Sequence, residues 1–374
     1  MSTRIILIVL ILALLVAGCT PTGQVVKQTD LEPIKIGVIL PLSGSSAYIG
    51  EYIKNGLEMA KEEINSAGGV IDRRLELIYE DSQGDTKTGI SAYQKLTQTD
   101  DAEIVLTAVS GVTLGVASLA EKDKIVILSI GGAAPSISEA GDYIFRHNLL
   151  PQEEARVLAD FIYHKMNITR MGVLAVNTES GVSMSNDFKS DYEGLGGEIE
   201  ITQMYARDEK DFKTYLLKIH EAGIKAVLNG GYSDQMSLIM KQSKAYGLSF
   251  TWFGVYSTET PEFLSAAGEA ADGMIYIHFL NPEDSAFKAY DTKFNVIYGK
   301  SPDPYAALAY DALKIIAKAL EECSAKDDSE CIKQRLYATQ DYHGVTGKIS
   351  FDKNGDTHKE LFIKTVKNGT FVKY

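Results

Sequence analysis

The chain has 374 residues, of which 45% are hydrophobic and 23% charged, a composition that is ordinary for a globular protein. This length exceeds one average domain, so we expect two lobes. The formal net charge of −13 argues against nucleic acid or an anionic membrane surface as a partner, because both are bound by clustered Lys and Arg side chains.

The first residues have the pattern of an export signal. Arg4 precedes an unbroken apolar run, Ile5 to Val16, which is shorter than the roughly 20 residues that span a bilayer as a helix. A secretory signal peptide over residues 1–18 fits better. Its end, "LVAGC", resembles a prokaryotic lipobox, which implies a lipid on Cys19; the alternative is an ordinary signal peptide with an incidental cysteine. Residues 19–33 then read as a flexible tether.

Strand-like and helix-like patterns alternate from residue 34 onward. In the first series we predict strands at 34–40, 74–81, 103–107 and 124–130, and helices at 51–65, 85–99 and 112–121. The series restarts after Pro151, with helices at 152–165, 182–193, 210–221 and 232–245 and strands at 170–176, 198–205, 225–230, 250–256 and 273–279. The last third adds helices at 284–297, 303–322 and 329–338 and ends in a hairpin over 344–374. Strands that are apolar on both faces predict parallel sheets covered by helices, and two such series predict two α/β lobes.

Small, hydroxyl-rich loops follow these strands. The first, "PLSGSSAYIG" (41–50), lacks both glycine fingerprints of nucleotide-binding folds. Similar loops lie at 107–113, 129–136, 176–182, 229–234 and 255–262. Ligands of open parallel sheets bind beyond the carboxyl ends of the strands, and helix N-termini favour anions. The loops therefore predict a site for a small carboxylate, with serine hydroxyls as donors and tyrosines as walls.

Other constellations point away from metal or catalytic chemistry. Cys323 and Cys331 flank a polar turn, and in an exported protein such a pair is expected to form a disulfide. "DKNGDT" (352–357) departs from a calcium loop, because Thr357 stands where the turn needs glycine, so a hairpin turn fits better. The six His are scattered and no G-x-S-x-G elbow occurs. We expect neither metal nor cofactor, and no enzyme.

The ordered set of loops resembles the branched-chain amino-acid-binding proteins of ABC transporters, which have the type I periplasmic binding fold. The stretches that carry the resemblance are "IGVILPLSGSSAYIGEYIKNGLEMAKEEINSAGGV", "DSQGDTKTGISAYQKL", "NGGYSDQM" and "FDKNGD", and it covers nearly all of 34–374. The family's two Rossmann-like lobes are joined by crossing hinge strands. The resemblance therefore implies lobe 1 from 34–148 plus 281–340 and lobe 2 from 149–280 plus 341–374, with the ligand in the cleft and the lobes closing over it.

The resemblance also implies site residues. The serine that receives the ligand's carboxylate falls at Ser110, the lobe-2 tyrosine at Tyr232 and an aromatic wall position at Tyr305. The loop that presents a backbone carbonyl and amides falls at Gly131, Gly132 and Ala133.

Three positions depart from the family pattern. Ala133 stands where amino-acid binders carry a threonine, Ser180 where a tyrosine usually lines lobe 2, and Tyr256 where an acid meets the ligand's ammonium. A buried ammonium without a countercharge costs several kcal/mol, comparable with the roughly 8 kcal/mol of a micromolar affinity. Either Glu259 reaches the cleft, which the family's usual cargo favours, or the ligand lacks an ammonium. The competitor is a carboxylate, an amide such as urea, or an aromatic acid stacked among Tyr48, Tyr232, Tyr256 and Tyr305.

These observations predict a lipid-anchored, extracytoplasmic and monomeric solute-binding protein that delivers a small amino acid or related carboxylate to ABC permease subunits. The membrane would be reached through the lipid on Cys19 alone. One rival is a ligand-sensing receptor module of the same fold, which the sequence barely separates from a delivery protein. Another is a hydrolase using the same cleft, but the candidate loops contain Ser and no His.

Overall fold

A computed structural model describes residues 31–323 and 328–374. The predicted signal peptide and the lipobox Cys19 lie outside these residues, as does the tether up to residue 30. Within the described part of the chain, no helix combines the length and the apolar character needed to cross a membrane. Residues 33–374 form one compact unit.

The first lobe is built on a parallel five-stranded sheet of order β2-β1-β3-β4-β5. Its strands are β1 (Ile34–Leu40), β2 (Leu75–Asp81), β3 (Ile104–Thr107), β4 (Val126–Ser129) and β5 (Ile144–Arg146). Alternate residues of a strand feed different cores: Ile36 and Val38 pack on one face, and Ile39 on the other. This double burial is the reason that β1 is a continuous apolar run.

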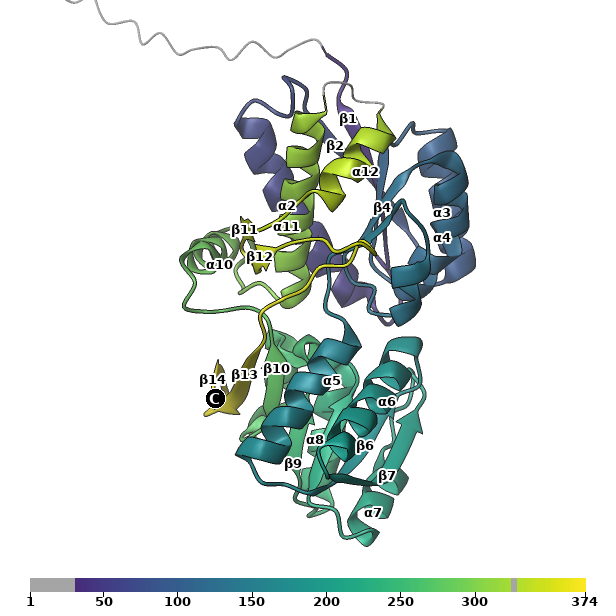
Figure 1. The fold of residues 1–374 in the computed structure, drawn as a ribbon. Coiled ribbons are helices and arrows are strands. Elements are labelled where there is room, and N and C mark those ends of the chain that lie inside the picture. The colour runs from purple at the N-terminus through teal and green to yellow at the C-terminus, as the bar shows by residue number, and fades with distance from the viewer. Residues whose placement is uncertain (1–30, 324–327) are drawn as a thin grey trace, which may run out of the picture. The chain divides into compact units, whose positions relative to one another are not determined.

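Helices cover both faces of this sheet (Figure 1). The helices on one face are α3 (Thr86–Gln98) and α4 (Ser110–Asp123). Those of the opposite core are α2 (Ala47–Ser66), α10 (Ser285–Tyr298), α11 (Pro304–Glu322) and α12 (Ser329–Tyr337). A 3₁₀ turn, η1 (Pro135–Glu139), follows β4. The last third of the chain thus completes the lobe that the first third begins.

The second lobe contains a seven-stranded sheet of order β14-β13-β10-β9-β8-β6-β7. Its strands are β6 (Arg170–Val176), β7 (Glu198–Tyr205), β8 (Ala226–Gly230), β9 (Thr251–Gly254), β10 (Ile275–His278), β13 (Phe362–Lys367) and β14 (Thr370–Lys373). The sheet is not wholly parallel, because the C-terminal hairpin pairs antiparallel with β10 through β13. A two-residue Asn368-Gly369 turn joins the hairpin strands.

Helices also cover both faces of the second sheet (Figure 1). One face carries α5 (Pro151–Asp160), continued by a π-turn η2 (Phe161–Lys165), and α6 (Glu179–Gly194). The other carries α7 (Lys213–Glu221), α8 (Ser233–Ala245) and α9 (Pro261–Ala267), with short turns η3 (Tyr256–Thr258) and η4 (Gly268–Ala271). The predicted fold class, two α/β lobes joined by crossing segments, is confirmed.

Three segments cross between the lobes. They connect β5 to α5, β10 to α10, and a small hairpin of β11 (Tyr342–Gly344) and β12 (Gly347–Ile349) to β13. Val345, Ile349 and Phe351 pack in the core of the first lobe, so the third crossing lies after Phe351 and later than the boundary expected at residue 341. Asp311 of α11 holds this hairpin by accepting from the Thr346 N–H at 2.8 Å.

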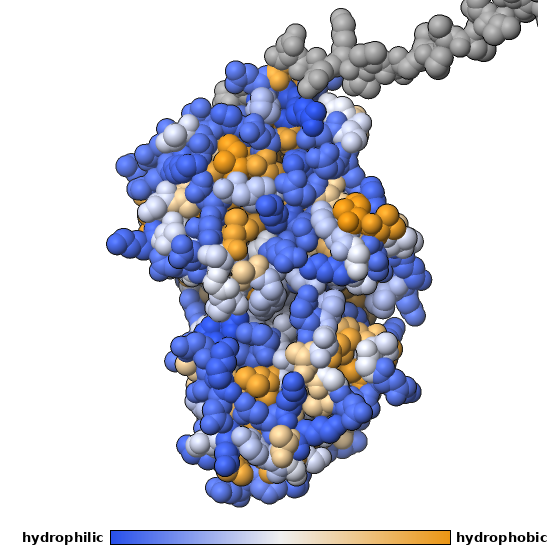
Figure 2. Space-filling view, turned by 180° about the vertical axis from the view of Figure 1, so that it is seen from behind, coloured by the Kyte–Doolittle hydropathy of each residue, from blue (hydrophilic) through white to orange (hydrophobic). Residues whose placement is uncertain are grey.

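A disulfide joins Cys323 and Cys331, whose Cα atoms are 6.0 Å apart, as the sequence predicts. It ties the end of α11 to the start of α12. The face shown in Figure 2 is mostly hydrophilic, with hydrophobic residues only in small separate groups.

Candidate functional site

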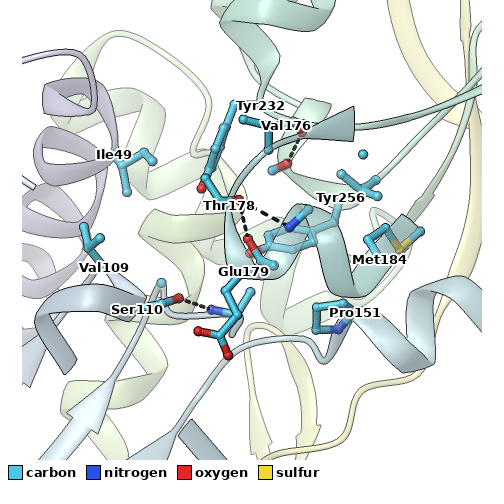
Figure 3. Close-up of a pocket in the computed structure, with 18 of the residues that line it drawn as sticks. Ile49, Val109, Ser110, Pro151, Val176, Thr178, Glu179, Met184, Tyr232 and Tyr256 are labelled. Atoms are coloured by element: carbon cyan, nitrogen blue, oxygen red, sulfur yellow. Dashed lines mark hydrogen bonds between the residues drawn. The ribbon is translucent and has the colours of Figure 1, made fainter. Parts of the chain in front are cut away.

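A cavity of about 310 Å³ lies between the two lobes. It is lined by first-lobe residues from the ends of β3 and β4 and from α2 and α11, and by second-lobe residues from the ends of β6, β8 and β9 and from α5 and α6. Its volume falls at the lower end of the range for small-molecule sites. Side chains from both lobes, including Ser110, Tyr232 and Tyr256, converge on it (Figure 3).

Seven of the ten predicted ligand residues line this cavity, namely Ser110, Gly131, Ala133, Ser180, Tyr232, Tyr256 and Tyr305. The other three do not. Gly132 donates its N–H to Ser129 Oγ at 3.3 Å. Tyr48 packs against the first core, with its phenol beside the Arg207–Asp234 pair of the second lobe. The third, Glu259, is the largest departure.

Glu259 is held outside the cavity by neighbours on the second sheet. Its carboxylate pairs with Lys364 Nζ at 2.6 Å and accepts from Tyr276 Oη at 2.5 Å, and His278 Nε2 lies 3.7 Å away. Although burial opposes it, these partners hold the pKa of Glu259 below its ordinary value. The expectation that Glu259 reaches into the cleft therefore fails in this structure, because the carboxylate already has a buried countercharge.

The first-lobe wall presents the start of α4 to the cavity. Ser110 and Gly111 begin this helix, and its N-cap residue Val109 supplies no side-chain hydrogen bond. The N–H groups of a first helical turn have no partner within the helix, and the helix dipole makes this end attractive to a carboxylate. A carboxylate at this point therefore needs no neighbouring Lys or Arg.

The hydroxyl of Ser110 is poised as a donor. Its Oγ accepts from the N–H groups of Ala133 and Ala134, each at 3.1 Å. A serine oxygen has two acceptor sites and one proton, so these two bonds leave the O–H to donate. The loop is fixed from behind by Arg146, whose Nη1 donates to the Ala134 carbonyl at 2.8 Å. The Ala133 N–H, expected to bind ligand directly, acts here through Ser110.

Close approach of loops shapes both walls. A Cβ on Gly131 would lie 2.4 Å from the Ala108 carbonyl oxygen, and one on Gly231 would lie 1.9 Å from Tyr205 Oη. Both distances are too short for any side chain, so glycine is required where the strand ends meet the cavity.

The second-lobe wall combines tyrosines with hydroxyls. The Arg207 guanidinium lies 4.6 Å from the ring centroid of Tyr232 and pairs with Asp234 at 2.9 Å. Tyr256 lies with its ring centroid 6.0 Å from that of the first-lobe Tyr305. These contacts orient the rings as fixed walls.

The hydroxyls of this wall are tied to the start of α6. Thr178 accepts from the Gly181 N–H at 3.3 Å, and its Oγ1 lies 3.2 Å from Ser180 Oγ (Figure 3). Ser180, where the family pattern has a tyrosine, therefore lines the cavity as part of a helix cap.

Two carboxylates that sequence reasoning missed also line the cavity, Glu154 and Glu179. Glu154 is 3% exposed and accepts from the Tyr256 N–H at 3.2 Å. Burial, reinforced by Glu153, raises the pKa of Glu154 from 4.5 to about 8 although the Tyr256 N–H opposes the shift. One signal for Glu154 was present in the sequence: it stands on the apolar stripe of its helix, four residues before Leu158.

Comparison with known proteins identifies the family of the chain. Residues 33–370 match the family model described as periplasmic binding protein. The leucine-, isoleucine-, valine-, threonine-, and alanine-binding protein of Pseudomonas aeruginosa is 27% identical over 350 residues, which is 92% of each chain.

Solved structures show the same fold. The branched-chain amino acid transporter substrate-binding protein LivJ of Streptococcus pneumoniae, in complex with isoleucine, is 25% identical, with a TM-score of 0.85 over 91% of this chain and 97% of that one. A leucine-binding protein of Thermotoga maritima has the same TM-score and coverage at 24% identity. The resemblance stated from the sequence is confirmed, and with it the expectation of a binding protein rather than an enzyme. The chain belongs to the periplasmic binding protein family, with the type I fold.

Proposed function

We propose that this protein binds a small amino acid or a related carboxylate in the cavity between its lobes and delivers it to the permease of an ABC importer. The observation that carries the proposal is the uncapped start of α4, where Ser110 has a proton left to donate into a cavity walled by tyrosines. The names of two relatives, a leucine-, isoleucine-, valine-, threonine-, and alanine-binding protein and a substrate-binding protein in complex with isoleucine, support the same ligand class.

Closure of the lobes is part of the proposal. Tyr52 Oη of α2 donates to Glu262 Oε1 of α9 at 2.9 Å, and Ser136 Oγ of η1 donates to Glu179 Oε1 of α6 at 2.5 Å. Each bond joins the first lobe to the second. These bonds support a closed form in which the ligand is shielded from water. Each charge-assisted hydrogen bond between the protein and the ligand would then contribute roughly 1.5–3 kcal/mol to binding.

A ligand panel tests this proposal. Calorimetry and thermal shift are run with L-leucine, L-valine, L-alanine, 4-methylpentanoate, benzoate and urea. We expect at least one of the five compounds that carry a carboxylate to bind. A ligand at a hundred times its dissociation constant should add about 2.7 kcal/mol of stability. X-ray scattering of the same samples should show smaller particles when the ligand is bound. If no carboxylate binds, or urea alone does, the proposed function is wrong.

We also propose that lipid on Cys19 anchors the protein outside the cell, where it acts as a monomer. The lipobox pattern ending at Cys19 and the extracytoplasmic location that the family implies support this. Stable anchoring needs more than one acyl chain, which a lipidated N-terminal cysteine can supply. A Cys19→Ser variant should move from the membrane fraction to the soluble fraction of cells, and a variant that stays with the membrane would contradict the anchor.

A further inference from the structure

The proposed anion site leaves one end of an amino acid without a partner. The positive walls of the cavity are helix N-termini, and no Lys, Arg or His is among its lining residues. An ammonium group therefore needs a carboxylate on the cavity surface. Glu259 is paired elsewhere, so the lining offers Glu154 and Glu179.

Glu154 has the geometry of an unused charge partner. It lies in the first turn of α5, directly after the crossing segment from β5, and is almost fully buried. Its Oε2 accepts from the Tyr256 N–H. In the described part of the chain, no Lys, Arg or His nitrogen comes within 4 Å of its carboxylate, and its Oε1 accepts no hydrogen bond from the protein. A buried carboxylate without a countercharge is costly, so it favours a cationic partner supplied from outside.

Glu179 is a weaker candidate. It is exposed, and its carboxylate already accepts from Ser136 Oγ and from the Ser136 N–H across the cleft. A charge in that position is screened by water, whereas a charge pair at Glu154 is not.

We infer that the Glu154 carboxylate binds the ammonium group of the ligand, and so selects amino acids over carboxylates that lack an ammonium. The inference rests on the proposed function, in which Ser110 and the start of α4 hold the ligand's carboxylate. The family pattern places the acid at the position of Tyr256, and in this chain Glu154 contacts the backbone N–H of that same residue. The buried acid on the cavity wall of this chain therefore lies on α5 and not at the end of β9.

The groups around Glu154 do not supply a competing cation. On its own helix, Glu153 pairs with His358 at 2.6 Å, and Arg156 lines a separate hollow with Asp187 and Asp191 of α6. His278, on the strand β10 that packs against α5, accepts from the Leu280 N–H and is buried. The carboxylate of Glu179 and the phenols of Tyr232 and Tyr256 belong to the same lobe, and Tyr305 faces them from the first lobe.

Proton release is the signature of this arrangement. With its raised pKa, Glu154 carries a proton at neutral pH while the cavity is empty. An arriving ammonium requires the ionised form, so binding must expel close to one proton to the buffer at pH 7. The affinity for an amino acid should therefore rise as pH increases from 6 to 8, by up to about tenfold per pH unit, and level off above 8.

The test uses the full-length chain, two ligands and two matched variants. Calorimetry with L-leucine and with 4-methylpentanoate, which is leucine without its ammonium, is run at pH 6, 7 and 8 in buffers of different ionisation enthalpy. Glu154→Gln should weaken L-leucine binding by about 30-fold or more, with loss of the proton release and of the pH dependence. Glu221→Gln, the same change at an exposed residue of α7 outside the cavity lining, should bind like the parent.

The outcomes separate this inference from the proposed function. Binding of L-leucine that Glu154→Gln leaves unchanged overturns the inference alone, as does a loss seen with Glu179→Gln instead. A parent protein that binds 4-methylpentanoate better than L-leucine and every other amino acid also overturns it, while the proposed function stands. If no carboxylate binds the parent at any pH, the proposed function falls and the inference with it.

Discussion

The two walls of the cavity differ in how they handle charge. The first-lobe wall is neutral and offers donors: a helix N-terminus and the Ser110 hydroxyl. The second-lobe wall offers an acceptor, the buried Glu154, among tyrosine rings. In a zwitterion bound between them, the carboxylate would face the donors of the first lobe and the ammonium would face Glu154 of the second lobe. Neither lobe alone would then complete the site. Because the two ends of the ligand need partners from different lobes, we expect ligand binding and lobe closure to be coupled.

The largest expected effect comes from removing the support of the first-lobe wall. Arg146 is fully buried and pairs with Asp356 of the third crossing segment through Nη2 at 2.7 Å, besides holding the Ala134 carbonyl. Arg146→Met leaves Asp356 buried and unpaired, so it should lower the free energy of unfolding by about 3–5 kcal/mol. Urea denaturation measures this.

The control for that variant is Arg170→Met. Arg170 is exposed and pairs with Glu200 at 2.8 Å on the surface of β6 and β7, so its loss should cost less than about 1 kcal/mol. Equal losses for the two variants would contradict the role given to burial.

The second effect is the pH dependence of the stability of the ligand-free protein, which depends on Glu154 of the second-lobe wall. Because the pKa of Glu154 is raised from 4.5 to about 8 in the folded protein, its contribution to stability is present below pH 4.5 and is lost as pH rises through 8. The empty parent should lose about 2–4 kcal/mol more than Glu154→Gln between pH 5 and 8.5. Urea denaturation at the two pH values tests this, and parallel losses in both proteins would refute it.

The third effect separates the two walls by ligand. Ser110→Ala removes a donor to the carboxylate, so it should weaken L-leucine and 4-methylpentanoate alike, by about 1.5–3 kcal/mol. Glu154→Gln, in contrast, should weaken only L-leucine. Calorimetry gives both affinities, and Ser91→Ala, on the exposed face of α3, is the matched control. A Ser110→Ala variant that keeps the parent's affinity for both ligands would contradict the role of the Ser110 hydroxyl as a donor to the carboxylate of the ligand.

The smallest effect tests the contact between the lobes. Tyr52→Phe removes the hydroxyl that reaches Glu262, so ligand affinity should fall by about 0.5–1.5 kcal/mol. Tyr79→Phe loses a similar bond, to Glu58 at 2.8 Å, but within the first lobe, and should leave affinity unchanged. The two variants are compared by calorimetry with the same ligand. A drop in both would mean that the tyrosines act through stability and not through closure.

Much of the fold was predictable from local pattern. The strands at 34–40, 170–176 and 198–205 have the bounds that their apolar runs predict, because these runs are buried on one or both faces of a sheet. The short strand β5 was missed, since "IFR" is only three residues long and takes its place through its neighbour β4.

The site residues also fall into two groups, those that local sequence reveals and those that depend on tertiary contacts. The loop at 107–113 was found from sequence because a strand end, small residues and a helix start are consecutive in the chain, an arrangement that favours an anion. The resemblance to the family then singled out Ser110 within this loop. Glu259 was the wrong acid for the cavity, since its partners Lys364 and Tyr276 lie on strands that no short stretch of sequence brings near it. Glu154 reaches the cavity because the first crossing segment sets α5 against the end of β9, over 100 residues later. The sequence by itself determined the two-lobed fold and the part of the site at the start of α4, because a helix start is a local feature of the chain. Only the tertiary structure decided which carboxylate is left unpaired, because charge pairing is a property of neighbours in space.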